Sequence, residues 1–164
     1  MDEMLVYQLF GVLPDPDQFL RVCSRLAAAV LLGAVVGIQR ELQGKPAGLR
    51  THALVTLSAA LFVVVPIEAG MEIADVSRVI QGVSTGIGFI GAGVILKLRE
   101  TRDVVGLTTS ATIWAATAVG IAIGLGYVVH AAVGVVLTWL VLTFFSMVDD
   151  WIEKRTGGRG ADDA

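Results

Sequence analysis

Long apolar stretches alternate with short charged segments along this chain, and this alternation constrains the fold more than any other feature of the sequence. A transmembrane helix needs roughly 20 predominantly apolar residues, and several stretches here reach that length. Only 16% of the 164 residues are charged, whereas an average soluble domain has roughly 25%. The sequence therefore predicts an all-α membrane protein whose outer surface faces lipid.

The apolar stretches delimit five candidate transmembrane helices, and a five-helix bundle is the predicted architecture. The approximate ranges are 19–38, 51–69, 79–98, 107–124 and 127–148. Residues 1–18 start with acidic side chains, unlike a cleavable signal peptide, and are expected to lie in the membrane interface. Residues 149–164 are polar and are expected to form a cytoplasmic tail.

Lysine and arginine residues predict the orientation, because basic residues accumulate in the short cytoplasmic loops of membrane proteins. With five spans, the three most basic segments fall on one side, which predicts a cytoplasmic C-terminus and an N-terminus outside. These segments contain Arg40, Lys45 and Arg50; Lys97, Arg99 and Arg102; and Lys154, Arg155 and Arg159. Arg21 and Arg25 near the outer end of the first span argue against this orientation unless they reach outward or pack against a partner.

The third predicted span contains "GIGFIG" (86–91), which matches the dinucleotide-binding pattern Gly-x-Gly-x-x-Gly. That pattern requires a preceding strand and a helix N-terminus, so a cofactor site inside a membrane span is rejected. Glycines at helical spacing instead allow two helix backbones to approach closely in lipid. This interpretation predicts a central third helix, packed through Gly82, Gly86, Gly88, Gly91 and Gly93.

A broken third helix is the alternative, because glycines also permit kinks whose free backbone groups can line a ligand cavity. Gln81, Ser84 and Thr85 would then supply polar atoms to the cavity. In a continuous helix, the same three side chains would form hydrogen bonds between helices.

The segment "RELQGKPAGLRTH" (40–52) gathers charged side chains between two apolar stretches. It is interpreted as a structural polar cluster, as a ligand or partner site, or as a solvated loop that sets topology, which accounts well for Lys45. Within it, Glu41 is predicted to pair with Arg50, or alternatively with Arg40. The loop before the fourth span adds further polar residues on the same side, although its threonines also suit hydrogen bonds within their own helix. The complete predicted cluster comprises Arg40, Glu41, Arg50, Thr51, His52, Arg102, Asp103, Thr108 and Thr109.

No catalytic set is predicted. His52 and His130 fall on opposite predicted membrane faces, and Cys23 has no base near it in the sequence. No Asp or Glu lies in the central part of a predicted span, whereas Mg²⁺ prefers carboxylate and water oxygens. The chain is therefore expected not to be an enzyme and to bind no cofactor, metal ion or nucleic acid. Its expected contact is with the lipid bilayer.

Three segments, in this order and spacing, resemble the MgtC/SapB family of bacterial inner-membrane proteins. They are residues 37–61, which include "QRELQGKPAGLRTHALVTLSAAL"; "GVSTGIGFIGAGVIL" (82–96); and "VVGLTTSATIWAATAVGIAIGLG" (104–126). The resemblance covers about residues 31–126. Gln39 departs from the family pattern, which allows Glu there, and this departure weakens any mechanism that needs two carboxylates at that place.

The resemblance implies a non-enzymatic regulatory or interaction protein of the bacterial inner membrane, linked to magnesium limitation and to survival inside host cells. Modulation of a membrane complex such as the F-type ATP synthase is also implied. Separately from the resemblance, the glycine face of the third span is expected to support a homodimer or higher homo-oligomer. A transporter or channel for magnesium or another small solute is the alternative. Many relatives have an additional soluble C-terminal domain, and this chain looks like the short, membrane-only form.

Overall fold

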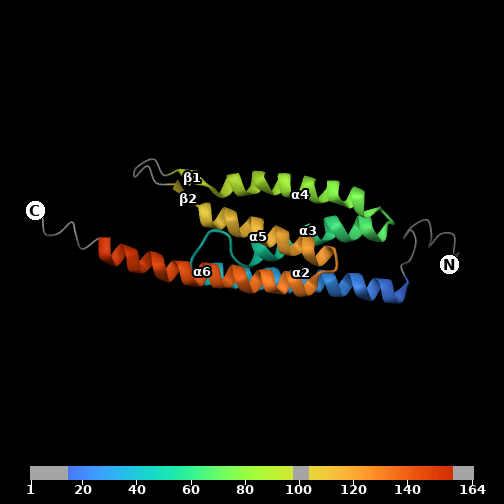
Figure 1. Cartoon of the computed structure of the whole chain (residues 1–164), viewed down its shortest axis with the longest axis horizontal. Coiled ribbons are helices and arrows are strands. Elements are labelled where there is room, and N and C mark those ends of the chain that lie inside the picture. Colours follow the sequence, from blue (N-terminus) through green and yellow to red (C-terminus); the bar gives the residue numbers. More distant parts are fainter. Residues whose placement is uncertain (1–14, 98–103, 157–164) are drawn as a thin grey trace, which may run out of the picture.

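The computed structural model describes residues 15–97 and 104–156, and five long helices lie side by side in it (Figure 1). A short antiparallel pairing of β1 (Leu96–Lys97) with β2 (Val104–Val105) connects the third helix to the fourth. The prediction of an all-α bundle is confirmed apart from these two short strands. The helices are α2 (Pro16–Leu42), α3 (Leu49–Glu68), α4 (Ile73–Val94), α5 (Leu107–Gly124) and α6 (Val128–Thr156).

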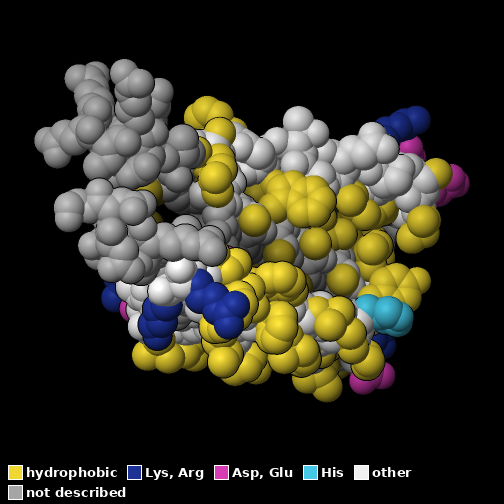
Figure 2. Space-filling view, turned by 60° about the vertical axis from the view of Figure 1, so that its left-hand side comes forward, with side chains coloured by type: hydrophobic (Ala, Val, Ile, Leu, Met, Phe, Trp, Pro, Cys, Tyr) yellow, Lys and Arg dark blue, Asp and Glu magenta, His cyan; other side chains and the backbone are white. Residues whose placement is uncertain are grey.

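Among the described helices, four are long and apolar enough to cross a membrane: α2, α3, α5 and the part of α6 from Val128 to Asp149. Large hydrophobic side chains are exposed over these helices, including Leu20, Phe62, Trp114 and Phe144, each more than half exposed. Figure 2 shows this hydrophobic flank in yellow, with dark blue Lys and Arg side chains at its margins. The chain is therefore a multi-pass membrane protein, because soluble proteins rarely expose so large a contiguous apolar surface to water.

The helix α4 does not reach the same hydropathy. Its sequence contains Asp75, Arg78, a glutamine, five glycines, two serines and a threonine, all of which lower its mean hydropathy. Figure 1 nevertheless shows it running alongside α5 over most of its length. A fifth span at α4 thus stays a prediction. The alternative of a broken helix does not hold, since α4 is continuous from Ile73 to Val94.

The turns between helices rely on glycine at positions where the backbone has positive φ. Gly44 (φ +64°) ends α2 and Gly126 (φ +91°) follows α5. At Gly44, the N–H of Lys45 donates to the Arg40 carbonyl and the N–H of Gly44 donates to the Glu41 carbonyl. This pattern of a longer bond enclosing a shorter one is the Schellman motif, which pairs the last free carbonyls of a helix. It produces the tight hairpin between α2 and α3.

The central helix of the bundle is α5, which packs against α2, α3, α4 and α6. It contains no charged residue, and small side chains on several of its faces let its neighbours approach. Gly120 and Gly124 lie so close to α3 that an added Cβ would stand 2.4 Å from the Thr56 carbonyl oxygen and 2.6 Å from the Val63 Cβ, respectively. These glycines therefore allow α5 and α3 to pack closely against each other.

The prediction of a central glycine-rich third helix is not confirmed. The helix α4 lies at the edge of the bundle, packs against α3 and α5, and buries only Val76 and Gly91. A Cβ added at four of its glycines would meet no atom within 4 Å: Gly82, Gly86, Gly88 and Gly93. Glycine removes an obstacle to close packing but contributes almost no apolar surface of its own, so it does not determine which helix occupies the centre.

The two ends of the molecule differ in which connections they contain. The α2–α3 turn, the β1–β2 pairing and the C-terminal part of α6 lie at one end, and the N-terminal part of α2 lies at the other (Figure 1). We call the first the basic end, because Arg40, Lys45, Lys154 and Arg155 belong to it. The loop with Arg99 and Arg102 lies outside the described residues. Which end faces the cytoplasm stays a prediction.

Arg25 lies at the opposite end, where the basic-residue pattern did not expect it. Its Nη1 donates to the carbonyl oxygen of Gly124 over 3.4 Å, at the C-terminus of α5. A cation is favourable there because the last carbonyls of a helix have no partner within the helix and form the negative end of its dipole. Arg25 is therefore half-buried against the bundle, which was one of its two predicted placements.

Candidate functional site

The last turn of α2 contacts three other helices through three consecutive side chains. Gln39 Nε2 donates to Thr143 Oγ1 on α6 over 2.8 Å, and Arg40 Nη2 donates to Thr109 Oγ1 on α5 over 2.9 Å. Glu41 accepts a bond from the N-terminus of α3, as described below. Consecutive residues on a helix point about 100° apart, so one turn can contact three neighbours. This turn thereby fixes α2 to the rest of the bundle.

Arg40 is the most unusual of these residues, because its side chain is only 2% exposed. Its Nη1 donates to Gln43 Oε1 over 3.2 Å and its Nη2 to Thr109, whereas the buried Nε has no hydrogen-bond partner among the described residues. No carboxylate of the described chain forms an ion pair with it. A buried guanidinium without a counter-charge is costly, so this charge is a strong candidate for a functional group.

The predicted ion pair of Glu41 with Arg50 or Arg40 is wrong. Glu41 Oε2 instead accepts the backbone N–H of Leu49 over 2.8 Å, and the Glu41 and Arg50 side chains are both exposed. The backbone amide of Leu49, at the start of α3, has no partner within its helix and lies within hydrogen-bonding distance of the Glu41 carboxylate. A helix N-terminus favours a negative charge. Glu41 does connect α2 to α3 as expected, through this capping bond.

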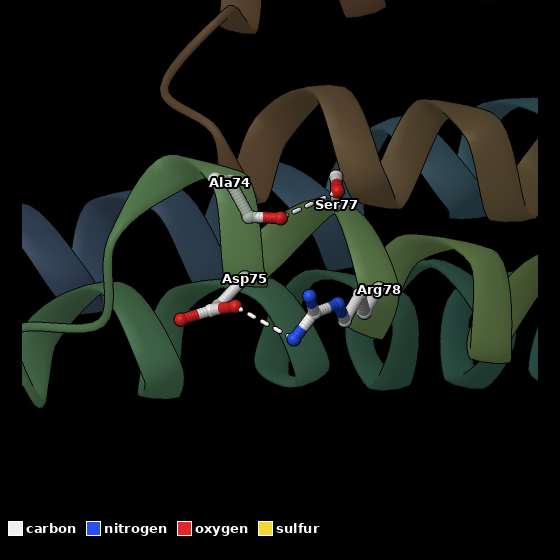
Figure 3. Close-up of polar contacts among 4 residues, drawn as sticks. All are labelled: Ala74, Asp75, Ser77 and Arg78. Carbon is white, nitrogen blue, oxygen red and sulfur yellow. Dashed lines mark hydrogen bonds and ion pairs between the residues drawn. The ribbon is translucent and has the colours of Figure 1, made fainter.

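One ion pair is present among the described residues, and it lies in the first turn of α4. Arg78 Nη1 is 3.0 Å from Asp75 Oδ1, and Figure 3 shows the two side chains on one side of the helix, with Ser77 donating to the Ala74 carbonyl nearby. Both charged side chains are at least half exposed. Such a pair contributes only about 0–1 kcal/mol, and it does not form part of the predicted cluster.

His52, in the first turn of α3, is fully buried, whereas Arg50 is exposed and Thr51 is half-buried. Its Nδ1 donates to the Gly48 carbonyl over 2.9 Å, and its Nε2 has no partner among the described residues. The Thr56 hydroxyl donates to the His52 carbonyl one turn along. Both bonds close within α3 and its N-cap Gly48, so they hold His52 to its own helix.

A polar pocket of about 960 Å³ opens at the basic end and has Arg40 in its lining. It lies between the α2–α3 turn, the end of α4, the start of α5 and one side of α6. We call it the Arg40 pocket. Its charged lining residues are Arg40, Lys45 and Asp149, and its other lining residues are Gln43, Gly44, Pro46, Gly93, Val94, Val105, Gly106, Leu107, Thr108, Thr109, Val141, Leu142, Phe145 and Ser146.

The structure brings only part of the predicted cluster to this pocket. Arg40, Thr108 and Thr109 line it. Arg102 and Asp103 lie outside the described residues. The remaining members are not among the lining residues, namely Glu41, Arg50, Thr51 and His52.

Sequence reasoning missed several residues of the Arg40 pocket. Lys45 was interpreted as a topology signal and Asp149 as part of the tail, yet both line the pocket. Gln39 drew attention only as a departure from the family pattern, whereas it is buried and bonded to α6. The approximately 100° step between neighbouring helix residues was the available signal for Gln39, since Gln39 and Arg40 must face different neighbours.

The polar side chains predicted within the third span have a modest role in the described chain. Thr85 is exposed and donates to the carbonyl of Gln81 in its own helix over 2.9 Å. Gln81 is exposed and Ser84 is half-buried. Thr85 therefore satisfies its hydroxyl locally, as threonine commonly does within a helix. Across the part of the chain that the structure describes, no three His, Cys, Asp or Glu side chains are grouped closely enough to hold a metal ion.

Comparison with known proteins identifies the family. The family model described as "MgtC family" matches residues 26–151, which include α3, α4 and α5, most of α2 and α6, and all lining residues of the Arg40 pocket. The chain belongs to the MgtC family. The resemblance expected from the three sequence motifs is thus confirmed. No solved structure matches this MgtC-family chain.

Three curated relatives illustrate the similarity of this MgtC-family protein. SrpB of Synechococcus elongatus is 44% identical, in a match that covers 81% of this chain and 79% of SrpB. SapB of Bacillus subtilis is 35% identical over 87% of this chain and 61% of SapB. YhiD of Escherichia coli K12, named as a candidate magnesium transporter, is 41% identical over 74% of this chain and 59% of YhiD. The match thus spans less than two thirds of SapB and YhiD.

Proposed function

We propose that this MgtC-family protein is a non-enzymatic regulatory protein of the bacterial inner membrane, linked to magnesium limitation and, in a host, to intracellular survival. It acts on a membrane complex, for which the F-type ATP synthase is a candidate, and the Arg40 pocket at its cytoplasmic end is the acting site. Membership of the MgtC family supports the membrane role. The printed name of the relative YhiD supports the link to magnesium.

The observation that carries this proposal is the buried Arg40 in the pocket lining. Its guanidinium has two side-chain partners and a free Nε, and neither partner has a negative charge. A buried cation of this kind favours an anionic group, either on a ligand or on an acidic segment of a partner protein. Binding of such a group would change the Arg40–Thr109 contact, which connects α2 to the central helix. The pocket is therefore suited to sense or hold a partner.

A magnesium transporter is the second candidate, favoured by the name of YhiD. Two features of the described chain weigh against it. The Arg40 charge repels a divalent cation at the pocket. Beyond the pocket, the bundle interior is filled by apolar side chains such as Val36, Ile113 and Ile123, all at most 2% exposed. Mg²⁺ gives up its water ligands reluctantly and needs oxygen ligands in their place.

The proposal is tested by comparing a charge reversal at the pocket with one outside it. Lys45→Glu places a carboxylate at the pocket, whereas Lys154→Glu changes an exposed lysine of α6 that is not among the lining residues. In cells grown in low magnesium, we expect Lys45→Glu to abolish the growth advantage and the recovery of a cross-linked membrane complex. Lys154→Glu should behave like the unchanged protein.

The matching measurement uses purified protein in liposomes loaded with a magnesium-sensitive dye. The regulatory proposal predicts no protein-dependent magnesium entry. Saturable magnesium flux that Lys45→Glu alters and Lys154→Glu does not would instead establish transport through the pocket. Equal effects of both variants on growth would remove the pocket from the function altogether.

A further inference from the structure

The Arg40 pocket adjoins an apolar groove, and the two together suggest a particular kind of ligand. The groove has a volume of about 310 Å³ and lies between α5 and α6. It shares Thr108, Val141 and Leu142 with the pocket. Its other lining residues lie farther along the same helices toward the middle of the bundle, among them Ala115 and Leu137. A cavity lined by charged and hydroxyl side chains thus borders an apolar groove that follows the same two helices.

The polar part of this combined site favours an anion. Arg40 supplies a buried positive charge with an unpartnered Nε, and Lys45 supplies a second positive charge in the lining. The N-terminus of α5 lies beside them, with Gly106 as the N-cap and no side chain capping it. The free amides at such a terminus, together with the helix dipole, favour phosphate groups. Among the described lining residues, Asp149 is the one acidic side chain, so two positive charges stand against one negative charge there.

The apolar part is open to the bilayer. Leu137 is 56% and Val141 is 53% exposed, and Ala111 is also exposed. In a membrane, these side chains face acyl chains instead of water. A hydrocarbon chain can therefore lie in the groove while its polar head occupies the pocket at the end of the same helices. Basic pockets between transmembrane helices are known to suit phosphorylated lipid headgroups.

We propose that the Arg40 pocket and the α5–α6 groove together bind one phospholipid, with the headgroup phosphate near Arg40 and Lys45 and an acyl chain between α5 and α6. This site goes beyond the proposed function, because a lipid can bind there whether or not the protein regulates a membrane complex. If both hold, the lipid occupies the site from which a partner would be sensed.

The test measures binding of phosphatidylglycerol to the purified full-length protein in a neutral detergent, by native mass spectrometry with titrated lipid. Diacylglycerol with identical acyl chains lacks the phosphate, and inorganic phosphate lacks the chains. We expect phosphatidylglycerol to bind at least about tenfold more tightly than either. A tenfold ratio corresponds to about 1.4 kcal/mol.

Two pairs of variants locate the lipid. Lys45→Gln should weaken phosphatidylglycerol binding about fivefold, whereas Lys154→Gln, outside the pocket, should change it less than about twofold. Ala111→Leu fills the groove and should weaken binding about tenfold. Ala118→Leu changes an exposed alanine of the same helix outside the groove and should have little effect. All four side chains are exposed, so the variants should fold, and thermal unfolding in detergent checks this.

The outcomes separate the possibilities. Equal binding of diacylglycerol would overturn recognition of the phosphate. Displacement of the lipid by inorganic phosphate, with no effect of Ala111→Leu, would make the pocket a site for soluble anions and would overturn the lipid proposal. Equal effects of Ala111→Leu and Ala118→Leu would indicate lipid bound anywhere around the bundle. Each of these results leaves the growth and liposome tests of the proposed function unaffected.

Discussion

The helices α4 and α5 are both rich in small residues, yet they occupy opposite situations in the bundle. The α5 backbone lies against α3 at Gly120 and Gly124, where an added Cβ would overlap existing atoms. At Gly82 and Gly86 of α4 the same addition would meet nothing. Small residues therefore permit close packing without enforcing it. The absence of charge from α5 and the presence of Asp75 and Arg78 in α4 distinguish the two helices more reliably than glycine spacing does.

The largest expected difference concerns the two sets of glycines. Gly120→Val places a branched side chain where a Cβ alone would stand 2.4 Å from the Thr56 carbonyl oxygen. Backbone atoms must then move, and we expect a loss of more than about 3 kcal/mol, with little folded protein recovered. Gly86→Val in α4 should leave the yield of monomer and its thermal unfolding in detergent nearly unchanged.

Self-association of the Gly86→Val variant in membranes extends the comparison of α4 with α5. Glycines at this spacing retain the capacity to receive another helix, so a second copy of the chain remains a predicted partner of α4. Cross-linking in native membranes measures this directly. A stable monomer that no longer cross-links would place the homo-oligomer interface at α4, whereas loss of monomer stability would show that the edge position of α4 is wrong.

Arginines give the second contrast. Arg40 is buried and bonded to α5, whereas Arg78 is exposed and bonded within α4. Arg40→Gln removes two charge-assisted hydrogen bonds and leaves Thr109 without its partner, so it should lower the free energy of unfolding by about 2–3 kcal/mol. Arg78→Gln should lower it by less than about 1 kcal/mol. Thermal unfolding of both variants at equal detergent concentration measures the two changes. Equal losses of stability in the two variants would contradict the burial of Arg40.

The third contrast is between two threonines, Thr109 on α5 and Thr85 on α4. Thr109→Val removes the acceptor of the Arg40 bond and should cost about 1.5–3 kcal/mol, near the effect of Arg40→Gln. The double variant should cost less than the sum of the two, because both changes remove one contact. Thr85→Val removes only a bond to the Gln81 carbonyl within α4 and should be almost neutral. An additive double variant would show that Arg40 and Thr109 stabilise the fold independently.

Sequence reasoning predicted the helical bundle well, because apolar length is a property of each segment alone. It assigned the centre to the wrong helix, since the position of α4 depends on the packing surfaces of the other helices and not on its own sequence alone. Arg40 and Thr109 were placed correctly in one cluster because both lie at the ends of neighbouring helices on the same side. Glu41 was paired with the wrong group, since a free backbone amide at Leu49 leaves no trace in the sequence.

The helices also differ in length, and the shortest one lies at the centre. With a rise of about 1.5 Å per residue, the 18 residues of α5 span about 27 Å and the 29 residues of α6 about 44 Å. Figure 1 shows α6 extending past the start of α5 at the basic end. A bilayer has a hydrocarbon core about 30 Å thick, so α5 is slightly shorter than that core and α6 is longer. Because Arg40 bonds to Thr109 in the first turn of α5, its guanidinium is set back from the end that α6 reaches.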